Sequence, residues 1–511
     1  MGRKCRYKLG QGVSLSINFS SHDAVRGRDT LVDFLIRLDG VGSIQQQVYK
    51  GIYNALAEGR LEPGQRFPAS RTWALELGVS RNTIREATAS LIVEGWLEAR
   101  SGSGLYVRDA LPPNKITPSN PSKRPQLSQW SDRLPPTMML LSDRHAHCDF
   151  RPGEVSRDAE NLLRPRRLAR WPSDLEPGLL SKYNQPEGDL RLRERIAAYL
   201  RQSRSVRCTS SNIVITTGTR QSLDILSRLL LGPATSIAVE DPGYPVVADI
   251  ARLCGADLVP LQVDENGIKV ADIPAGISAV YCTPNHQFPL GVSLSMERRH
   301  ELLARAAANN FVIVEDDYDC EFYYGAMPPP CLQSMDKDDR IIYVGSLSKT
   351  LAPAFRAGFI VSPPWLGEKV RMAKWAVDRQ TSTHVQNTLL QLMVSGEFAS
   401  HLKRMRTEYA KRRATLLEDI RRLLRNWLIP LESSCGLHIS ARVIHGYDAQ
   451  ALCRIADANG VGIYQAREFS TTGRAADILV FGFGRTSLEE IKLGIGLLAT
   501  GWQKEASSWR T

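Results

Sequence analysis

The chain has 511 residues, of which 43% are hydrophobic and 23% charged, as in globular proteins with large cores. Lys and Arg number 65 against 54 Asp and Glu, and this formal net charge of +11 indicates one basic surface rather than a polycationic chain. No apolar run approaches the roughly 18 residues of a membrane span, no signal peptide follows the basic start, and the nine cysteines contain no Cys-x-x-Cys pair. These features exclude a membrane protein, argue against a disulfide framework or a structural zinc site, and favour the cytoplasm.

Composition divides the chain into four segments. Residues 1–40 have no clear pattern and are expected to form an N-terminal arm. Residues 41–110 predict a compact helical module that ends in a Gly-rich hairpin. Residues 111–147 contain seven prolines and predict a semi-rigid linker. In residues 148–511, short apolar runs alternate with longer amphipathic segments, which predicts an α/β domain.

Three helices and a hairpin are expected in the first module. Apolar residues at i+4 steps predict a helix over Ser43–Glu58. Ser70 is expected to cap a short helix that ends at Leu77, and Ser80 a third helix that ends before Gly95. The short connection between the last two helices is typical of a helix-turn-helix. Strands at 96–100 and 105–107 around Ser-Gly-Ser-Gly would form a wing.

The start of the third helix carries residues that can recognise DNA. Arg81, Asn82 and Arg85 have side chains that bind guanine and adenine edges, and recognition helices present their N-terminal residues to bases. Ser80 and Thr83, with the exposed helix N-terminus, suit phosphate. Taken alone, the same residues are equally consistent with a solvated helix face whose Ser-x-x-Thr is only a cap.

The stretch from Leu61 to Val107 closely resembles the winged helix of GntR-type regulators. The matching motifs are Gly-Arg-Leu-Glu-Pro-Gly-Gln-Arg-Phe-Pro-Ala-Ser-Arg, Leu-Gly-Val-Ser-Arg-Asn-Thr, Glu-Gly-Trp-Leu and the Gly-Ser-Gly turn. The resemblance implies a DNA-binding domain whose DNA-facing positions are Arg71, Arg81, Asn82, Thr83, Arg85 and Gly102.

In the second half, Lys349 follows a predicted strand in the sequence Gly-Ser-Leu-Ser-Lys-Thr. A lysine at the carboxyl end of a strand, near the crevice where α/β sheets bind ligands, can form a Schiff base with an aldehyde. Ser346, Ser348 and Arg356 carry the hydroxyl and guanidinium groups that bind phosphate. A lone Ser-x-x-Lys is more often an ordinary surface loop.

Three further segments fit the same kind of site. Asp316 and Tyr318 follow another predicted strand; the carboxylate can pair with a pyridine nitrogen and the tyrosine with a phenolic oxygen, although an acidic, metal-binding loop is the alternative. Gly218, Thr219 and Arg220 lie at a strand–helix turn, where backbone donors bind phosphate. Tyr244 follows a third strand and can stack on a ring; alone, it is more typical of a buried turn tyrosine.

Together these segments resemble fold-type I aminotransferases from about residue 150 to 500. Tyr183-Asn-Gln-Pro-Glu-Gly, Thr283-Pro-Asn-His-Gln and Glu315-Asp-Asp-Tyr-Asp are similar to the MocR subfamily of GntR regulators, which fuse a winged helix to an aminotransferase-like domain. The resemblance implies a pyridoxal 5'-phosphate (PLP) site. By this resemblance, Lys349 would form the Schiff base, Asp316 would pair with the pyridine nitrogen and Tyr318 with the phenolic oxygen. The remaining implied roles are phosphate binding by Arg356, Ser346, Gly218 and Thr219, ring contact by Tyr244, a place beside the cofactor for Asn285 or His286, and Tyr183 reaching over from a partner subunit.

One position departs from the family pattern. Relatives have Leu-Arg-Leu-Gly-Phe near the C-terminus, where the Arg binds a substrate carboxylate, whereas this chain has Val480 at that place. Arg485, Arg474 or Arg467 are candidate substitutes that spacing alone does not select. The missing clamp weakens the expectation of amino-acid turnover.

The sequence therefore predicts a cytoplasmic, PLP-dependent transcriptional regulator rather than an enzyme, with no bound metal. By resemblance it is a homodimer, arranged head-to-tail, that binds a double-stranded DNA operator and senses PLP or a small amine or amino-acid effector. The alternatives are an active aminotransferase with an appended DNA-binding domain, and a dimerisation scaffold that binds no cofactor.

Overall fold

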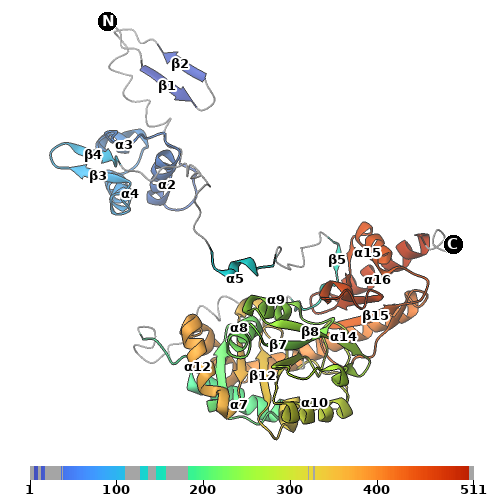
Figure 1. Cartoon of the computed structure of the whole chain (residues 1–511). Coiled ribbons are helices and arrows are strands. Elements are labelled where there is room, and N and C mark those ends of the chain that lie inside the picture. Colours follow the sequence, from blue (N-terminus) through green and yellow to red (C-terminus); the bar gives the residue numbers. More distant parts are fainter. Residues whose placement is uncertain are drawn as a thin grey trace. The chain divides into compact units, whose positions relative to one another are not determined.

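In the computed structural model (Figure 1), the structure describes residues 5–9, 13–17, 36, 38–109, 127–135, 146–156, 182–319, 321–325 and 328–505. The chain divides into two compact units, Met1–Pro125 and Gln126–Thr511. The division falls within the predicted Pro-rich linker.

The first unit contains the predicted helices and hairpin. Its elements are β1 (Cys5–Leu9), β2 (Val13–Ile17), α2 (Ile44–Ala57), α3 (Ser70–Glu76), α4 (Arg81–Val93), β3 (Leu97–Arg100) and β4 (Gly104–Val107). β3 and β4 pair antiparallel, as expected for a wing. β1 and β2, within the first forty residues, also pair antiparallel, a pairing that no sequence pattern indicated.

Capping and apolar burial explain these helices. Ser43 forms a capping box with Gln46, and the Ser80 hydroxyl accepts a hydrogen bond from the Thr83 backbone N–H at 3.1 Å. The predicted cap at Ser70 is wrong: α3 begins at Ser70 itself, and the preceding Ala69 makes no side-chain cap. The three helices bury a common apolar core, which includes Val48, Ile52, Leu56, Trp73, Ile84, Leu91, Leu97 and Val107.

The second unit is built on an eight-stranded sheet with the order β6-β13-β12-β11-β10-β7-β8-β9. In that order the strands are Ile213–Thr216, Gly358–Val361, Ile341–Ser346, Val312–Asp317, Ala279–Cys282, Ser236–Asp241, Asp257–Asp264 and Gly267–Ile268. β12, β11, β10, β7 and β8 are mutually parallel, whereas β13 is antiparallel to both of its neighbours. The central strands are apolar on both sides, as expected for a sheet covered on both faces.

Helices cover both faces of this sheet (Figure 1). Apolar residues of α8, α9 and α12 pack on one face, and those of α7, α10 and α13 pack on the other. The bounds are α7 (Leu190–Arg204), α8 (Thr219–Leu230), α9 (Pro245–Cys254), α10 (Met296–Asn309), α11 (Leu332–Met335), α12 (Pro364–Asp378) and α13 (Thr383–Val394). The expected α/β fold class is confirmed.

A smaller subdomain follows along the chain. Its antiparallel sheet has the order β14-β15-β18-β17 and contains Leu428–Pro430, His438–Val443, Ile478–Gly482 and Tyr464–Gln465. The short strands β5 (Cys148–Asp149) and β16 (Val461–Gly462) pair in parallel. Helices α14 (Glu397–Leu423), α15 (Ala449–Ala458) and α16 (Leu488–Glu505) share a second core with β15 and β18.

Part of the predicted linker belongs to the second unit. Helix α5 (Gln129–Asp132) is followed by Arg133, whose guanidinium lies over Gly255. Leu134 and Pro135 line the large cavity described below. Residues 133–135 of the predicted linker therefore contact the second unit, while most of residues 127–132 are exposed.

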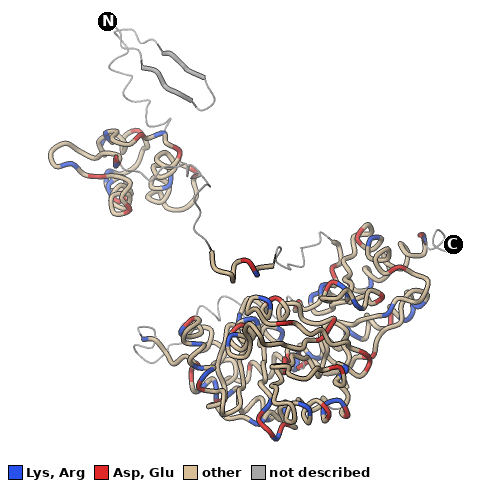
Figure 2. The backbone as a smooth tube through the Cα atoms, in the orientation of Figure 1, with Lys and Arg blue, Asp and Glu red and all other residues tan. Residues whose placement is uncertain are grey.

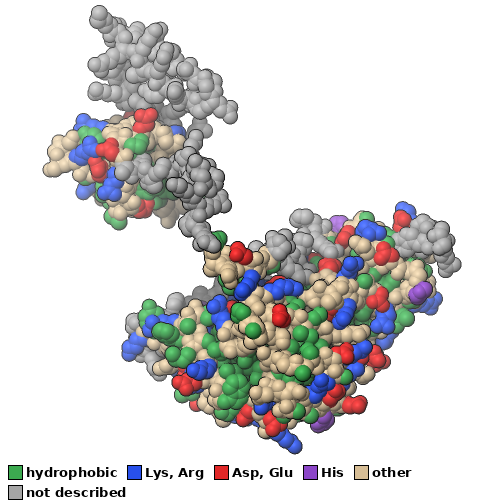
Figure 3. Space-filling model, viewed as in Figure 1, with side chains coloured by type: hydrophobic (Ala, Val, Ile, Leu, Met, Phe, Trp, Pro, Cys, Tyr) green, Lys and Arg blue, Asp and Glu red, His purple; other side chains and the backbone are tan. Residues whose placement is uncertain are grey.

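Charge is distributed over both units (Figure 2), and the visible face of the second unit mixes apolar and charged side chains (Figure 3). No helix in the described part of the chain is long and apolar enough to cross a membrane.

Candidate DNA-binding and cofactor sites

The first turn of α4 presents the predicted recognition residues. Arg81, Asn82 and Arg85 are exposed, and Thr83 is partly exposed, whereas Ile84 and Ala87 on the opposite side are buried. Among the described residues, none accepts a hydrogen bond or forms an ion pair with the guanidinium of Arg81 or Arg85. The amphipathic pattern thus leaves these cations on the surface, available to a ligand.

The side chains of Ser80 and Thr83 also form a hydrogen bond with each other. Their hydroxyl oxygens are 2.9 Å apart, in addition to the Ser80 cap on the Thr83 backbone. This confirms the cap, and it aligns the helix N-terminus, a ready site for a phosphate group. Arg71 near the start of α3 and Gly102 in the β3–β4 turn are exposed as well. On the wing, the Arg100 guanidinium lies 4.5 Å from the centre of the Tyr106 ring.

The second unit contains a cavity of about 740 Å³ at the carboxyl ends of the central strands. It is lined by eight of the predicted cofactor residues: Thr219, Arg220, Tyr244, Asp316, Tyr318, Ser346, Lys349 and Arg356. They come from segments far apart in the chain, and the parallel strand order brings them to one edge of the sheet.

Lys349 extends into this cavity from the loop after β12. Its Nζ donates a hydrogen bond to the Gly153 carbonyl oxygen. Removal from water lowers the pKa of the Lys349 ammonium, although the carboxylates of Asp319, Glu154 and Asp316 oppose that shift. A lowered pKa favours the neutral amine that attacks an aldehyde.

Asp316 at the end of β11 provides the test of whether a PLP ring fits. Its Oδ2 accepts a hydrogen bond from the Tyr281 hydroxyl at 2.8 Å, and its Oδ1 is buried with no partner among the described residues. Burial raises the pKa of Asp316 to about 7; the Tyr281 hydrogen bond opposes the shift, and the nearby Asp317 and Glu240 add to it. A protonated pyridine nitrogen would satisfy Oδ1 and restore the ionised carboxylate. The residues therefore fit the cofactor.

The other end of the cavity suits a phosphate. Gly218 precedes α8 with φ +112°, and a Cβ there would lie 3.6 Å from the Arg356 guanidinium. Arg356 itself has a left-handed backbone with φ 50°, an uncommon conformation for a residue with a side chain. Ser346 and Thr219 line the same space. Cation, hydroxyls and a helix N-terminus thus converge there.

Tyr244 and Arg220 lie along the cavity wall. Burial raises the pKa of Tyr244, and the positive charge of Arg220 opposes that shift. Phe288, which sequence reasoning did not select, also lines the cavity, with its ring centre 6.4 Å from that of Tyr244. The wall therefore combines aromatic faces with one guanidinium.

Four predicted cofactor residues are absent from the described lining of the cavity: Gly218, Asn285, Ser348 and Tyr183. Asn285 is buried, but its Oδ1 accepts from the Arg299 guanidinium at 3.1 Å. Ser348 donates its backbone N–H to the Ser346 hydroxyl at 3.2 Å. Tyr183 is 74% exposed, and the Arg379 guanidinium lies 3.8 Å from its ring centre.

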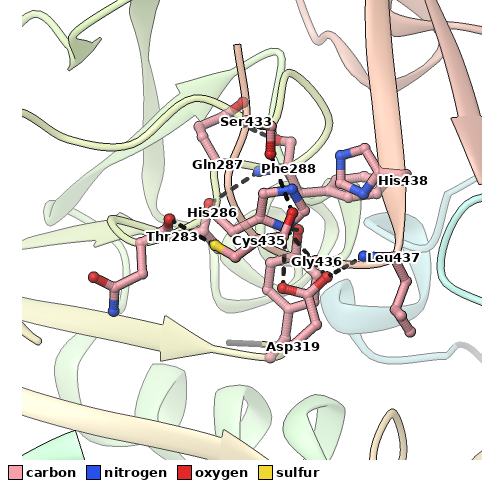
Figure 4. Close-up of polar contacts among 12 residues, drawn as sticks. Thr283, His286, Gln287, Phe288, Asp319, Ser433, Cys435, Gly436, Leu437 and His438 are labelled. Carbon is pink, nitrogen blue, oxygen red and sulfur yellow. Dashed lines mark hydrogen bonds and ion pairs between the residues drawn. The ribbon is translucent and has the colours of Figure 1, made fainter. Parts of the chain in front are cut away.

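A buried polar cluster behind Tyr318 was not anticipated in full. His286 and His438 lie side by side, with ring centres 4.5 Å apart, and Asp319 contacts the former (Figure 4). Their ligand-type atoms lie within 4.8 Å of one another, so the three could hold a metal ion. The His-Gln motif after β10 was the available signal for His286, whereas His438 and Tyr281 stand in strands whose contacts no local pattern reveals.

The missing clamp position is occupied by a core residue. Val480 is fully buried in β18 and pairs with Ser440 and Tyr464 of the adjacent strands. Of the candidate substitutes, Arg485 pairs with Glu154 at 2.9 Å and Arg474 lies 4.0 Å from Asp241. Among the described cavity-lining residues, the arginines are Arg220 and Arg356.

Known proteins resemble both units. Residues 44–107 match the model for bacterial regulatory proteins of the gntR family, and residues 151–474 match aminotransferase class I and II. The chain is 35% identical over 424 residues to the probable rhizopine catabolism regulatory protein MocR of Rhizobium meliloti, covering 82% of this chain and 85% of that one. It is 30% identical to the pyridoxine biosynthesis transcriptional regulator PdxR of Corynebacterium glutamicum, covering 86% and 92%.

A solved structure shares the fold of the second unit. The kynurenine aminotransferase of Pyrococcus horikoshii matches with a TM-score of 0.64 and 24% identity, over 71% of this chain and 92% of that one. The family models and these relatives agree with the fold of both units. The chain belongs to the MocR type of GntR transcriptional regulators, which carry an aminotransferase class I and II domain.

Proposed function

We propose that this regulator binds PLP through Lys349 and that occupancy of the cavity modulates operator binding by α4. The observation that carries the proposal is the buried, unpartnered Oδ1 of Asp316 in the cavity that Lys349 enters. Such an orphaned acceptor is costly unless a donor fills it.

Each residue has a defined part. When bound, PLP supplies an aldehyde for a covalent bond with an amine and an electron-withdrawing ring. Lys349 offers the amine, Asp316 accepts the pyridine N–H, and Tyr318 contacts the phenolic oxygen. Arg356, Ser346 and the first turn of α8 hold the phosphate, and Tyr244 covers a ring face.

We further propose a cytoplasmic homodimer, arranged head-to-tail. The exposed Tyr183 is then placed to reach a partner's cavity. Two winged helices per dimer imply an operator with two half-sites. This chemistry admits one class of effector: a small amine or amino acid that competes with Lys349 for the aldehyde. Such an effector changes operator binding only if it binds the DNA-binding and non-binding states of the protein with different affinities.

The experiment compares the visible spectrum and operator affinity of the wild type, Lys349→Ala and the control Lys369→Ala, an exposed lysine of α12. We expect a visible band with added PLP in the wild type and the control and its loss or shift in Lys349→Ala. Operator affinity should respond to PLP or an amine only where the band is present. A wild type with no band would disprove the proposal.

An active aminotransferase is the second candidate, because the lowered pKa of Lys349 also suits proton transfer. Sustained turnover of an amino acid with a keto-acid acceptor would establish it. The buried Val480, in place of the carboxylate-binding arginine, favours regulation instead.

A further inference from the structure

A histidine–aspartate pair lies directly behind Tyr318. The His286 Nδ1 is 3.0 and 3.1 Å from the two carboxylate oxygens of Asp319 and 3.0 Å from the Tyr318 hydroxyl oxygen. The His286 and Asp319 side chains are 0% and 2% exposed. Because an ionised carboxylate only accepts hydrogen bonds, Nδ1 carries the proton in this contact.

The direction of the next hydrogen bond follows from that proton. The Nδ1–H is shared between Asp319 and the Tyr318 oxygen, so the phenol accepts from His286 and donates its own proton elsewhere. Tyr318 lines the same cavity as Lys349 and Asp316. We propose that His286, held by Asp319, is a positioning residue that makes Tyr318 a hydrogen-bond donor toward the phenolic oxygen of PLP. This inference rests on the proposed cofactor binding.

The surrounding chain holds the pair in place. The Leu437 backbone N–H donates to Asp319 Oδ2 at 3.2 Å. Gly436 presses on the His286 ring so closely that a Cβ at Gly436 would lie 1.8 Å from Cε1 (Figure 4). The centre of the Tyr318 ring is 5.8 Å from that of His286. The ionisable groups that face His286 are Asp319, Tyr318, Cys435, His438 and Arg413.

The hydrogen bonds favour this role over metal binding by the same cluster. His286 Nδ1 is engaged by Asp319 and Tyr318, and His438 Nε2 contacts the Pro289 carbonyl oxygen at 2.9 Å. The His286 Nε2 has no hydrogen-bond partner among the described residues, so it is the nitrogen that a metal ion could use. Metal binding is therefore an outcome that the experiment distinguishes.

The test compares His286→Asn with His286→Leu, two branched side chains with four heavy atoms each. The amide of Asn restores an N–H near the position of Nδ1, whereas Leu removes it. Without that donor, the Tyr318 hydroxyl donates to the Asp319 carboxylate instead. It then no longer stabilises negative charge on the phenolic oxygen of the cofactor. The pH midpoint of the visible band should then rise by about one unit in His286→Leu and stay near the wild-type value in His286→Asn.

Two controls isolate the route through Tyr318. In a Tyr318→Phe background, His286→Leu should add no further shift. His401→Leu removes a buried histidine bonded to the Thr350 carbonyl, outside the pair, and should leave the midpoint unchanged. Asp319→Asn provides a second variant: it removes the charge that fixes the His286 proton and should shift the midpoint as His286→Leu does.

Several results would overturn the inference. These are equal midpoints in His286→Asn and His286→Leu, an undiminished shift in the Tyr318→Phe background, or a stoichiometric metal that His286→Leu removes. A wild type with a normal PLP band and any of these outcomes refutes only the positioning role. A wild type without a band refutes the proposed function, and the inference with it.

Discussion

Helix α4, the proposed recognition helix, and the proposed cofactor cavity are built in opposite ways. α4 exposes Arg81 and Arg85, and the residues that matter lie within one helical turn of each other. The cavity instead buries Asp316 beside Tyr281, whose side chain comes from a different strand. The exposed face of a capped helix can be predicted from a short motif, whereas a buried site depends on partners that only the tertiary fold supplies.

The largest expected effect should show whether the two units fold and function independently. Trp73 is fully buried, and its ring centre is 4.7 Å from that of Phe67. Trp73→Ala should destabilise the winged helix by about 3–5 kcal/mol, because it removes a large core side chain. Operator binding should be lost in a mobility-shift assay while the PLP band persists. Loss of both would show that the units do not fold independently.

A change of nearly constant volume tests the cavity. Asp316→Asn keeps the hydrogen bond to Tyr281 possible but loses the charge that matches a protonated pyridine nitrogen. PLP affinity, measured by absorbance titration, should fall roughly 10- to 100-fold, as expected for a hydrogen bond to a charged group. An unchanged affinity would remove Asp316 from the cofactor site.

In helix α4, Arg81→Ala should weaken specific operator binding by about 1–3 kcal/mol. Lys50→Ala is the matched control, since it removes one positive charge from α2, where Lys50 pairs with Asp39 at 2.7 Å. Equal losses in both variants would indicate attraction by net charge alone, and an unaffected Arg81→Ala would mean that the recognition helix is misassigned.

The smallest effect concerns a surface pair of the second unit. The hydrogen bond from Arg298 lowers the pKa of Asp264 below its usual 3.8, and the two form a bidentate contact at 2.5 and 2.8 Å. A lowered pKa in the folded state means stabilisation that is present above pH 3.8 and is lost as the pH falls through the folded value. Asp264→Asn should therefore cost about 1 kcal/mol near neutral pH and nothing in strong acid. A pH-independent difference in thermal unfolding would contradict this.

The sequence was informative wherever chemistry and local pattern coincide. The wing, the α4 cap at Ser80 and the strands that lead to Asp316 and Lys349 follow from residue order alone. The Ser70 cap failed because a serine inside the first turn looks the same in sequence as one just before it. His438 and Phe288 could not be placed, since their contacts depend on how separate elements pack.

Two residues near the start of the second unit form part of the cavity wall. Leu134 and Pro135, at the end of the segment that leaves α5, line the same space as Lys349. Any molecule that fills that space contacts a stretch of chain leading back toward the DNA-binding unit. Thermodynamic reciprocity then applies: to the extent that the molecule stabilises one placement of residues 127–135, that placement increases the affinity for the molecule by the same factor.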